Sequence, residues 1–273
     1  MTDTDRELLR ATFGQDAELY DRARPGYPDQ MFADLAQLAG LTRQSRVLEI
    51  GCGTGQATGP LAQLGCTIVA VELSSDMATV ARRNLHDFPN VTIEVSPFED
   101  WAPPAAPFDL VLSATAFHWI DPDIRVHKAA DVLRPDGTLA VIRSEHIAGG
   151  TERFFIDAQA CYERFDPKTP PGWRQAPAAD IPDDSSEIDF SQRFGAARFR
   201  RYEWEQSYTT GSYLDLLMTY SPTRALPQPA RDGLLSCLGG LIDRDHNGQI
   251  SKRHLTQLTL AHKTITAATP RQE

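Results

Sequence analysis

The sequence predicts an α/β fold in which helices cover both faces of a mostly parallel, doubly wound sheet. Three observations support this prediction. In the first half of the chain, short apolar runs typical of buried strands alternate with segments of helical spacing. A loop with glycines at every second position directly follows the first apolar run, in VLEIGCGTGQ at 47–56. An acidic residue, Glu72, closes the second apolar run.

The elements predicted in the first half follow one another with short connections. Strands are predicted at 46–50, 66–73, 91–95, 108–114 and 138–144. Helices are predicted at 56–64, after Ser74 or Ser75, and from Asp121-Pro122 to about 133. Each helix has a local reason to begin or end, because a glycine stops the first, a serine caps the second, and an Asp-Pro pair opens the third.

The pattern is weaker outside this half. The segment 13–28 is expected to form a helical arm, and 164–192, rich in Pro, Asp and Ser, is expected to be a mobile loop or lid. A strand is predicted at 198–208 and helices interrupted by prolines at 211–243. The segment 250–263 is expected to hold a last strand, and the tail after it to fray.

Composition excludes several classes of function. The chain has 273 residues, 41% of them hydrophobic, and a net charge of −10. This charge argues against nucleic-acid partners and against binding to anionic membranes. The N-terminus lacks a signal-peptide pattern, so a cytoplasmic location is expected. The four cysteines have no metal-type spacing and are expected to be free thiols in a reducing compartment; no metal is expected.

The glycine loop indicates a ligand that approaches the backbone closely. A dinucleotide fingerprint would need a third glycine at position 56, but that residue is Gln56, and the pattern is GxGxG. Glu72 lies 21 residues after Gly51, where a carboxylate can accept both hydroxyls of a ribose. These residues predict an adenosine-containing ligand without a required pyrophosphate. A domain that binds NAD or no nucleotide remains an alternative.

The chain resembles the class I S-adenosylmethionine-dependent methyltransferases. The resemblance rests on VLEIGCGTG, on VAVELSSDM, and on the later stretch from FEDWAPP to TLAVI, and it covers about residues 40–145. The N-terminal pattern FxxxAxxYDxxRPxYP resembles a small-molecule subgroup that includes trans-aconitate methyltransferase-like proteins. The resemblance implies a seven-stranded sheet with a helical N-terminal arm and a C-terminal helical insertion. It also implies four segments: 1–40 (arm), 41–145 (cofactor-binding core), 146–263 (substrate-pocket insertion and final strands) and 264–273 (tail).

The resemblance also implies which residues bind the cofactor, S-adenosylmethionine, and its product S-adenosylhomocysteine. Glu49, where the family usually has Asp, and the glycines of the loop would hold the methionine part. Glu72 would hold the ribose, and the adenine would meet Leu73, Phe98 and Glu99, although Pro97 replaces a common Asp. Met77 would contact the adenine or belong to the hydrophobic core, and Arg24 would close over the cofactor or be a cation on the protein surface. The full set is Tyr20, Arg24, Glu49, Gly51, Gly53, Gly55, Glu72, Leu73, Met77, Phe98, Glu99 and Ser113, the last near the transferable methyl.

One histidine is a candidate for the catalytic base. His118 lies in ATAFHWID, directly after the fourth strand, at the sheet edge where ligands of open α/β sheets bind. Its ordinary pKa allows it to accept a proton or to orient a substrate, and a structural role is the alternative. The substrate pocket is expected between the arm and 145–245, with Trp173 and Tyr213 among the aromatic residues that could line it.

The sequence therefore predicts methyl transfer to a small-molecule acceptor by a monomer or homodimer. Two alternatives remain: a cofactor-binding module without methyl transfer, and a methyltransferase acting on tRNA or protein. SATA at 113–116 stands where an NPPY-type motif would serve the amino group of a nucleobase or Gln. Near the C-terminus, DRDHNGQI at 243–250 resembles the opening of an EF-hand loop, but its twelfth position is His254, and a polar turn is expected.

Overall fold

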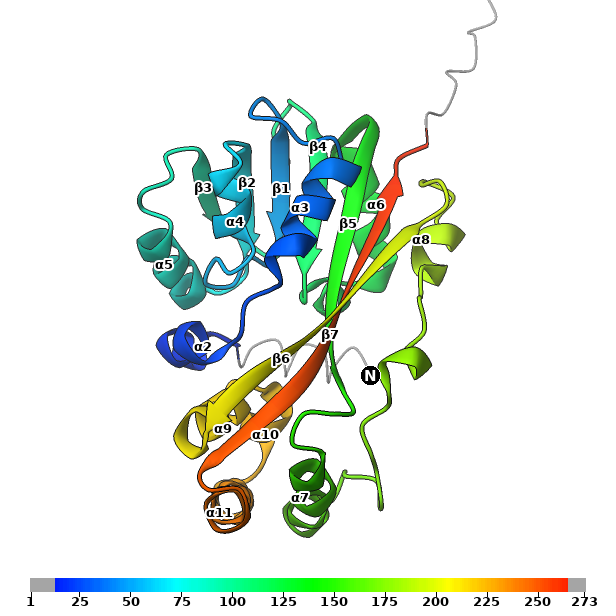
Figure 1. Cartoon of the computed structure of the whole chain (residues 1–273). Helices are drawn as coiled ribbons and strands as arrows, with labels where there is room; N and C mark the ends of the chain where they lie inside the picture. The colour runs from blue at the N-terminus through cyan, green and yellow to red at the C-terminus, as the bar shows by residue number, and fades with distance from the viewer. Residues whose placement is uncertain (1–12, 265–273) are drawn as a thin grey trace, which may run out of the picture.

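The computed structural model describes residues 13–264 of the chain (Figure 1). Within this range the seven-stranded, mostly parallel sheet predicted from the sequence is confirmed, with strand order β3-β2-β1-β4-β5-β7-β6. The strands from β3 to β5 pair in parallel, whereas β7 is antiparallel to both β5 and β6. Their bounds are β1 Arg46–Ile50, β2 Thr67–Glu72, β3 Val91–Val95, β4 Phe108–Ala114, β5 Leu133–Ile147, β6 Arg198–Thr209 and β7 Gln249–His262.

The helices of the described residues form an N-terminal arm, the covering layers of the sheet and a second group near the C-terminus. The α-helices are α2 Ala17–Ala23, α3 Asp29–Leu38, α4 Thr58–Gln63, α5 Ser75–Asn84, α6 Pro122–Val132, α7 Glu152–Phe165, α8 Ser186–Phe190, α9 Thr210–Leu217, α10 Ser221–Ala225 and α11 Gln228–Asp245. The 3₁₀ turns are η1 Phe13–Asp16, η2 Phe117–Trp119 and η3 Ala178–Asp180. The first residues of the predicted arm and the tail beyond Thr264 lie outside the described range.

The sheet separates two hydrophobic cores because successive side chains of a strand point to opposite faces. On β1, Val47 packs into the core that α3 and α4 cover, whereas Leu48 packs into the core that α6 covers. On β4, Leu110 and Val111 divide in the same way. This division confirms the doubly wound arrangement.

Capping residues and turn residues determine where helices α4, α5 and α6 begin. The Ser74 hydroxyl accepts a hydrogen bond from the Met77 amide at 3.3 Å and caps α5. Asp121 caps α6 through a 2.9 Å bond from the Asp123 amide, and Pro122 occupies the first turn. The helix predicted at 56–64 begins later, at Thr58, because the glycine loop extends through a turn before the chain becomes helical.

Strands β6 and β7 extend beyond the rest of the sheet and reach a second group of helices (Figure 1). The segment predicted at 138–144 is longer in the structure because β5 continues along β7 as far as the pair Ile147 and Arg253. Helices α7, α9 and α11 pack there around a third core that includes Phe154, Tyr213 and Leu238. The irregular segment 164–192 contains the end of α7, the turn η3 and the short helix α8 as regular elements.

Two of the four cysteines form a disulfide, which corrects the expectation of four free thiols. Cys161 on α7 and Cys237 on α11 are bonded, with their Cα atoms 5.9 Å apart, whereas Cys52 and Cys66 are buried thiols. The sequence could not show this pair, because 76 positions separate the two residues and only the packing of α7 against α11 brings them together.

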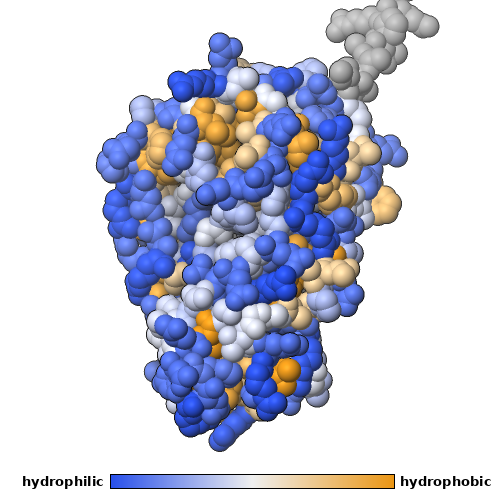
Figure 2. All heavy atoms as spheres, in the orientation of Figure 1, coloured by the Kyte–Doolittle hydropathy of each residue, from blue (hydrophilic) through white to orange (hydrophobic). Residues whose placement is uncertain are grey.

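Hydrophilic side chains cover most of the face shown in Figure 2, with small hydrophobic patches between them. Among residues 13–264, no helix has both the length and the apolar character needed to cross a bilayer. The partial EF-hand pattern spans the last turn of α11, a turn at Asn247 and Gly248, and the start of β7. His254, its twelfth position, is buried in β7.

Candidate active site

The glycine loop connects β1 to α4 and needs its glycines for two different reasons. Gly51, Gly53 and Gly55 have φ angles of +71°, +58° and +100°, which residues with a Cβ rarely adopt. At Gly51 the neighbouring chain also leaves no room, since a Cβ would lie 2.5 Å from Cβ of Ala116. The glycines leave the backbone of this loop without side chains, and at Gly51 it packs closely against the segment that follows β4.

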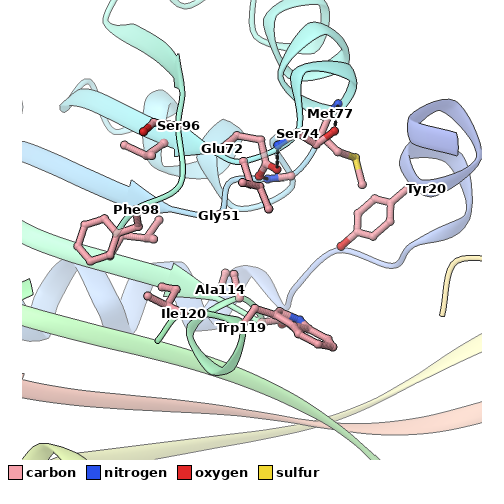
Figure 3. Close-up of a pocket in the computed structure, with 16 residues that line it drawn as sticks. Tyr20, Gly51, Glu72, Ser74, Met77, Ser96, Phe98, Ala114, Trp119 and Ile120 are labelled. Atoms are coloured by element: carbon pink, nitrogen blue, oxygen red, sulfur yellow. Dashed lines mark hydrogen bonds between the residues drawn. The ribbon is translucent and has the colours of Figure 1, made fainter. Parts of the chain in front are cut away.

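Glu72, at the carboxyl end of β2, is tied to both neighbouring segments. Its Oε2 accepts a 2.9 Å hydrogen bond from the Gly53 amide, and its Oε1 accepts a 2.9 Å bond from the Ser74 amide. The carboxylate is therefore held in one orientation between the glycine loop and the start of α5 (Figure 3). A carboxylate at the end of a second strand is the group that accepts the two hydroxyls of a ribose in nucleotide-binding α/β folds.

Glu49 lies beneath the loop and is only 1% exposed. Its Oε2 has no hydrogen-bond partner among the described residues. Burial raises the pKa of this carboxyl to about 7, the Thr58 hydroxyl opposes the rise, and the charge of Glu72 adds to it. A buried carboxyl oxygen without a partner indicates a place where a ligand cation would be bound.

Around the loop lies a pocket whose walls come from five parts of the chain (Figure 3). Tyr20 reaches in from α2, opposite Trp119 from the turn η2. Seven residues predicted for the cofactor site line this pocket: Tyr20, Gly51, Gly53, Glu72, Leu73, Met77 and Phe98. The structure therefore brings together parts of α2, the glycine loop, the start of α5 and the segments after β2 and β3.

Other predicted residues lie outside the lining of this pocket. Ser113 is fully buried, and its hydroxyl donates to the Ile50 carbonyl at 3.0 Å, so it joins β4 to β1. Glu99 accepts a 3.1 Å bond from the Asp121 amide through its carboxylate. Gly55 packs against Leu85, which a Cβ on the glycine would meet at 3.0 Å.

Arg24 also lies outside the pocket lining, next to one of its walls. Its guanidinium carbon lies 5.1 Å from the ring centroid of Tyr20 and 4.3 Å from that of Tyr220, and Nη2 donates to the Thr219 carbonyl at 3.0 Å. Arg24 therefore connects the arm to the second group of helices.

His118 lies on η2, next to the pocket-lining Trp119, with the two ring centroids 4.8 Å apart. The residue is exposed and is not part of the pocket lining. Partial burial of the imidazole, together with the charges of Arg125 and Arg143, lowers its pKa to about 4. The ring is therefore neutral near pH 7 and free to accept a proton.

The structure adds pocket residues that motif reading did not single out. They are Ile50, Val71, Ser74, Ser96, Ala114, Thr115, Ala116, Trp119 and Ile120. Most of them follow the carboxyl ends of β2, β3 and β4, so the rule that ligands bind at that edge could have found them. Thr115 carries a further signal, since it has a φ of +54° and its hydroxyl is hydrogen-bonded to that of Tyr27 at 2.9 Å.

The residues of the pocket fit an adenosine ligand that also carries an amino acid group. Glu72 offers acceptors for a diol, apolar side chains such as Met77 and Phe98 can cover a flat ring, and the bare glycine loop admits a chain. Glu49 lies outside the lining of the pocket, buried beneath the glycine loop. Its Oε2, which has no partner among the described residues, fits the ammonium of an amino acid. None of the described residues form a group of histidine, cysteine and carboxylate side chains suited to a metal ion.

Comparison with known proteins relates this arrangement to one family. Residues 47–137 match the family model of a methyltransferase domain. An uncharacterised methyltransferase of Mycobacterium tuberculosis is 35% identical over 139 residues, which are 50% of this chain and 54% of that protein. The chain thus spans about half the length of the curated relatives it matches.

Solved structures share the fold across nearly the whole chain. A candidate type II methyltransferase from Anaeromyxobacter dehalogenans aligns with a TM-score of 0.60 and 23% identity, over 88% of this chain and 97% of that one. Phosphoethanolamine N-methyltransferase 2 from Haemonchus contortus, in complex with phosphomonomethylethanolamine and S-adenosylhomocysteine, aligns with a TM-score of 0.55 and 19% identity. That alignment covers 97% of this chain and 61% of the other.

Proposed function

The chain carries a methyltransferase domain of the class I, S-adenosylmethionine-dependent family, and from that premise we propose that it transfers a methyl group from this cofactor to a small-molecule acceptor. The observation that carries the proposal is the pair of carboxyl groups around the glycine loop. Glu72 is held in place for a ribose diol, and Glu49 has a buried oxygen without a partner among the described residues.

Each of these residues has a distinct part in the proposal. Glu49 pairs with the ammonium of the methionine moiety, Glu72 accepts the ribose hydroxyls, and Leu73, Met77 and Phe98 enclose the adenine. When bound, the cofactor supplies a methyl carbon that its sulfonium makes electrophilic, so the protein's main task is to position the acceptor in line. Tyr20 and Trp119 line the pocket from different elements (Figure 3), and we expect them to limit the access of water to the bound cofactor.

We propose His118 as the group that removes a proton from the acceptor where its nucleophile carries one. Two observations bear on this role: the ring is next to Trp119 of the pocket wall, and it is neutral near pH 7. A conjugate acid with a pKa of about 4 makes a weak base, so this role suits an acceptor that loses its proton readily.

Calorimetry with S-adenosylmethionine and S-adenosylhomocysteine tests the cofactor proposal. Wild type should bind both, and Glu72→Gln should weaken binding about tenfold or more, because two hydrogen bonds to a charged acceptor lose strength. Asp76→Asn, an exposed change at the start of α5, is the control and should leave the affinity nearly unchanged. Equal affinity in wild type and Glu72→Gln would remove the ribose assignment.

Turnover separates an enzyme from a binding module. Wild type should convert S-adenosylmethionine to S-adenosylhomocysteine with at least one member of a panel of small hydroxyl, amine, thiol and carboxylate compounds. Binding of the cofactor without turnover on that panel, on tRNA or on protein would favour the binding module. Turnover only on tRNA or protein would replace the small-molecule acceptor by a macromolecule.

A further inference from the structure

A second cavity, of about 770 Å³, lies among α7, α10, the end of β5 and the loop at 166–175. Trp173 and Tyr213, which the sequence suggested for a substrate pocket, are among its lining residues. The rings of Phe155 and Tyr220 form further parts of its wall. The cavity is therefore large enough for a small organic molecule, and part of its wall is aromatic.

At the wall of this cavity lies a buried lysine that has no partner in the part of the chain that the structure describes. Lys252 on β7 is 4% exposed, and its Nζ lies 5.7–5.8 Å from the ring centroids of Phe155, Tyr213 and Tyr220. Among residues 13–264, no hydrogen bond or ion pair engages this ammonium. Cation–π contacts replace only part of the hydration that the ammonium loses, so the site favours an anion.

The surroundings of Lys252 are positive rather than neutral. Burial, together with the charge of Arg24, lowers the pKa of the Lys252 ammonium to about 7. The Nε of Arg24 is itself buried without a hydrogen-bond partner among the described residues. Two carboxylates, Glu152 and Asp166, also line the cavity, but the charge acting on Lys252 comes from Arg24.

Three side chains in succession separate this cavity from the cofactor pocket. Tyr20 lines the cofactor pocket and Tyr220 lines the second cavity, and the guanidinium of Arg24 lies between the two rings. Tyr220 is in turn held by His146, whose Nε2 lies 3.0 Å from its hydroxyl oxygen. A molecule in the second cavity is therefore kept apart from the cofactor pocket by these side chains.

We propose that the second cavity binds an organic carboxylate, that Lys252 anchors its carboxylate group, and that the aromatic part of the wall holds its apolar body. This inference goes beyond the proposed function, because Tyr20, Arg24 and Tyr220 keep a ligand of this cavity apart from the cofactor pocket. One unpartnered ammonium matches a monoanion better than a phosphate dianion.

Binding of trans-cinnamate and of its neutral counterpart trans-cinnamamide, measured by calorimetry with saturating S-adenosylhomocysteine, tests the anchor. Wild type should bind the carboxylate about tenfold or more tighter than the amide, since a charge-assisted bond is lost with the amide. Lys252→Met should abolish this preference. Lys168→Met, which removes an exposed cation from the rim of the same cavity, should keep it.

The pH dependence gives a second readout that a purely structural lysine would not show. Arg24, His146, His254 and the tyrosines Tyr213 and Tyr220 are charged or titratable side chains that contact Lys252 or interact with its charge. Burial first, and then nearby positive charge, lowers the pKa values of both histidines, and burial raises the pKa values of both tyrosines, so these four groups are neutral near pH 7. Carboxylate affinity should therefore fall as the pH rises above about 7, where free Lys252 loses its proton.

The outcomes separate this inference from the proposed function. Failure of cinnamate to bind while S-adenosylhomocysteine binds normally would overturn the inference alone, as would equal affinity for acid and amide. A preference for the acid over the amide that survives in Lys252→Met would also overturn the inference. Tighter binding of phenyl phosphate than of cinnamate would show that the site prefers a phosphate dianion to a carboxylate. Failure of S-adenosylhomocysteine to bind wild type would instead overturn the proposed function.

Discussion

Replacement of Glu49 by glutamine should affect stability and ligand binding in opposite directions. The carboxyl is 1% exposed, one of its oxygens has no partner among the described residues, and its pKa is raised to about 7 from an ordinary 4.5. Glutamine keeps the shape of the protonated acid and cannot ionise. Without a buried charge, the free variant should be more stable than wild type near neutral pH. Without the carboxylate that pairs with a ligand ammonium, it should bind the ligand more weakly.

The size of the stability effect follows from the pKa difference. Between pH 4.5 and 7 the unfolded chain releases a proton from Glu49 while the folded protein keeps it, so wild-type stability falls with rising pH relative to Glu49→Gln. One pH unit corresponds to about 1.4 kcal/mol, so the interval from 4.5 to about 7 corresponds to roughly 3 kcal/mol. The difference should be near zero at pH 4 and should reach its plateau above pH 7.

Urea unfolding of the free protein at pH 4, 5.5, 7 and 8 measures this difference directly. Glu205→Gln, an exposed glutamate on β6, is the matched control and should follow wild type at every pH. Calorimetry with S-adenosylhomocysteine then gives the opposite result. Wild-type affinity should rise between pH 5.5 and 7.5 as Glu49 ionises, and Glu49→Gln should bind about tenfold or more weaker at pH 8.

Two results would refute this reasoning. If Glu49→Gln is no more stable than wild type at pH 8, the carboxyl is not destabilised by burial in the free protein. If its affinity for S-adenosylhomocysteine matches that of wild type at pH 8, the group does not meet the ligand ammonium, whatever its effect on stability.

Three further predictions concern other parts of the chain. Gly51→Ala should destabilise the fold by about 2 kcal/mol or more and weaken cofactor binding, because it combines a φ of +71° with a 2.5 Å contact to Ala116. Gly53→Ala, whose added Cβ would have its nearest neighbours at 3.7 Å or more, should destabilise the fold by only about 1–2 kcal/mol. Equal urea midpoints of the two variants would contradict this difference. His118→Ala should lower turnover about 10²–10⁴-fold with little change in calorimetric cofactor affinity, and a wild-type rate would assign His118 a structural role. Cys161→Ser should lower stability by about 2–4 kcal/mol in thermal unfolding under non-reducing conditions, with no further loss when a reductant is added.

The sequence by itself determined the fold and the cofactor-binding edge of the site. Residues 46–50, 91–95 and 108–114 were predicted as strands with the same bounds that the structure has, because short runs rich in β-branched and other apolar residues between turn residues are typical of strands. The glycine loop and Glu72 were recognisable because their roles depend on backbone freedom and on position at a strand end. Both are local properties, so a short sequence pattern is enough to predict them.

The tertiary structure alone decided what depends on segments far apart in the sequence. The disulfide between Cys161 and Cys237 exists because α7 and α11 pack together, and no spacing rule indicates it. Ser113, a candidate from its position at a strand end, faces the neighbouring strand β1 rather than the pocket. Lys252 occurs in an ordinary polar stretch of β7, and only the packing of three aromatic rings around it shows that its ammonium is buried and without a partner among the described residues. The burial of a side chain and its hydrogen-bond partners depend on residues far away in the sequence, so they are defined only once the chain is folded.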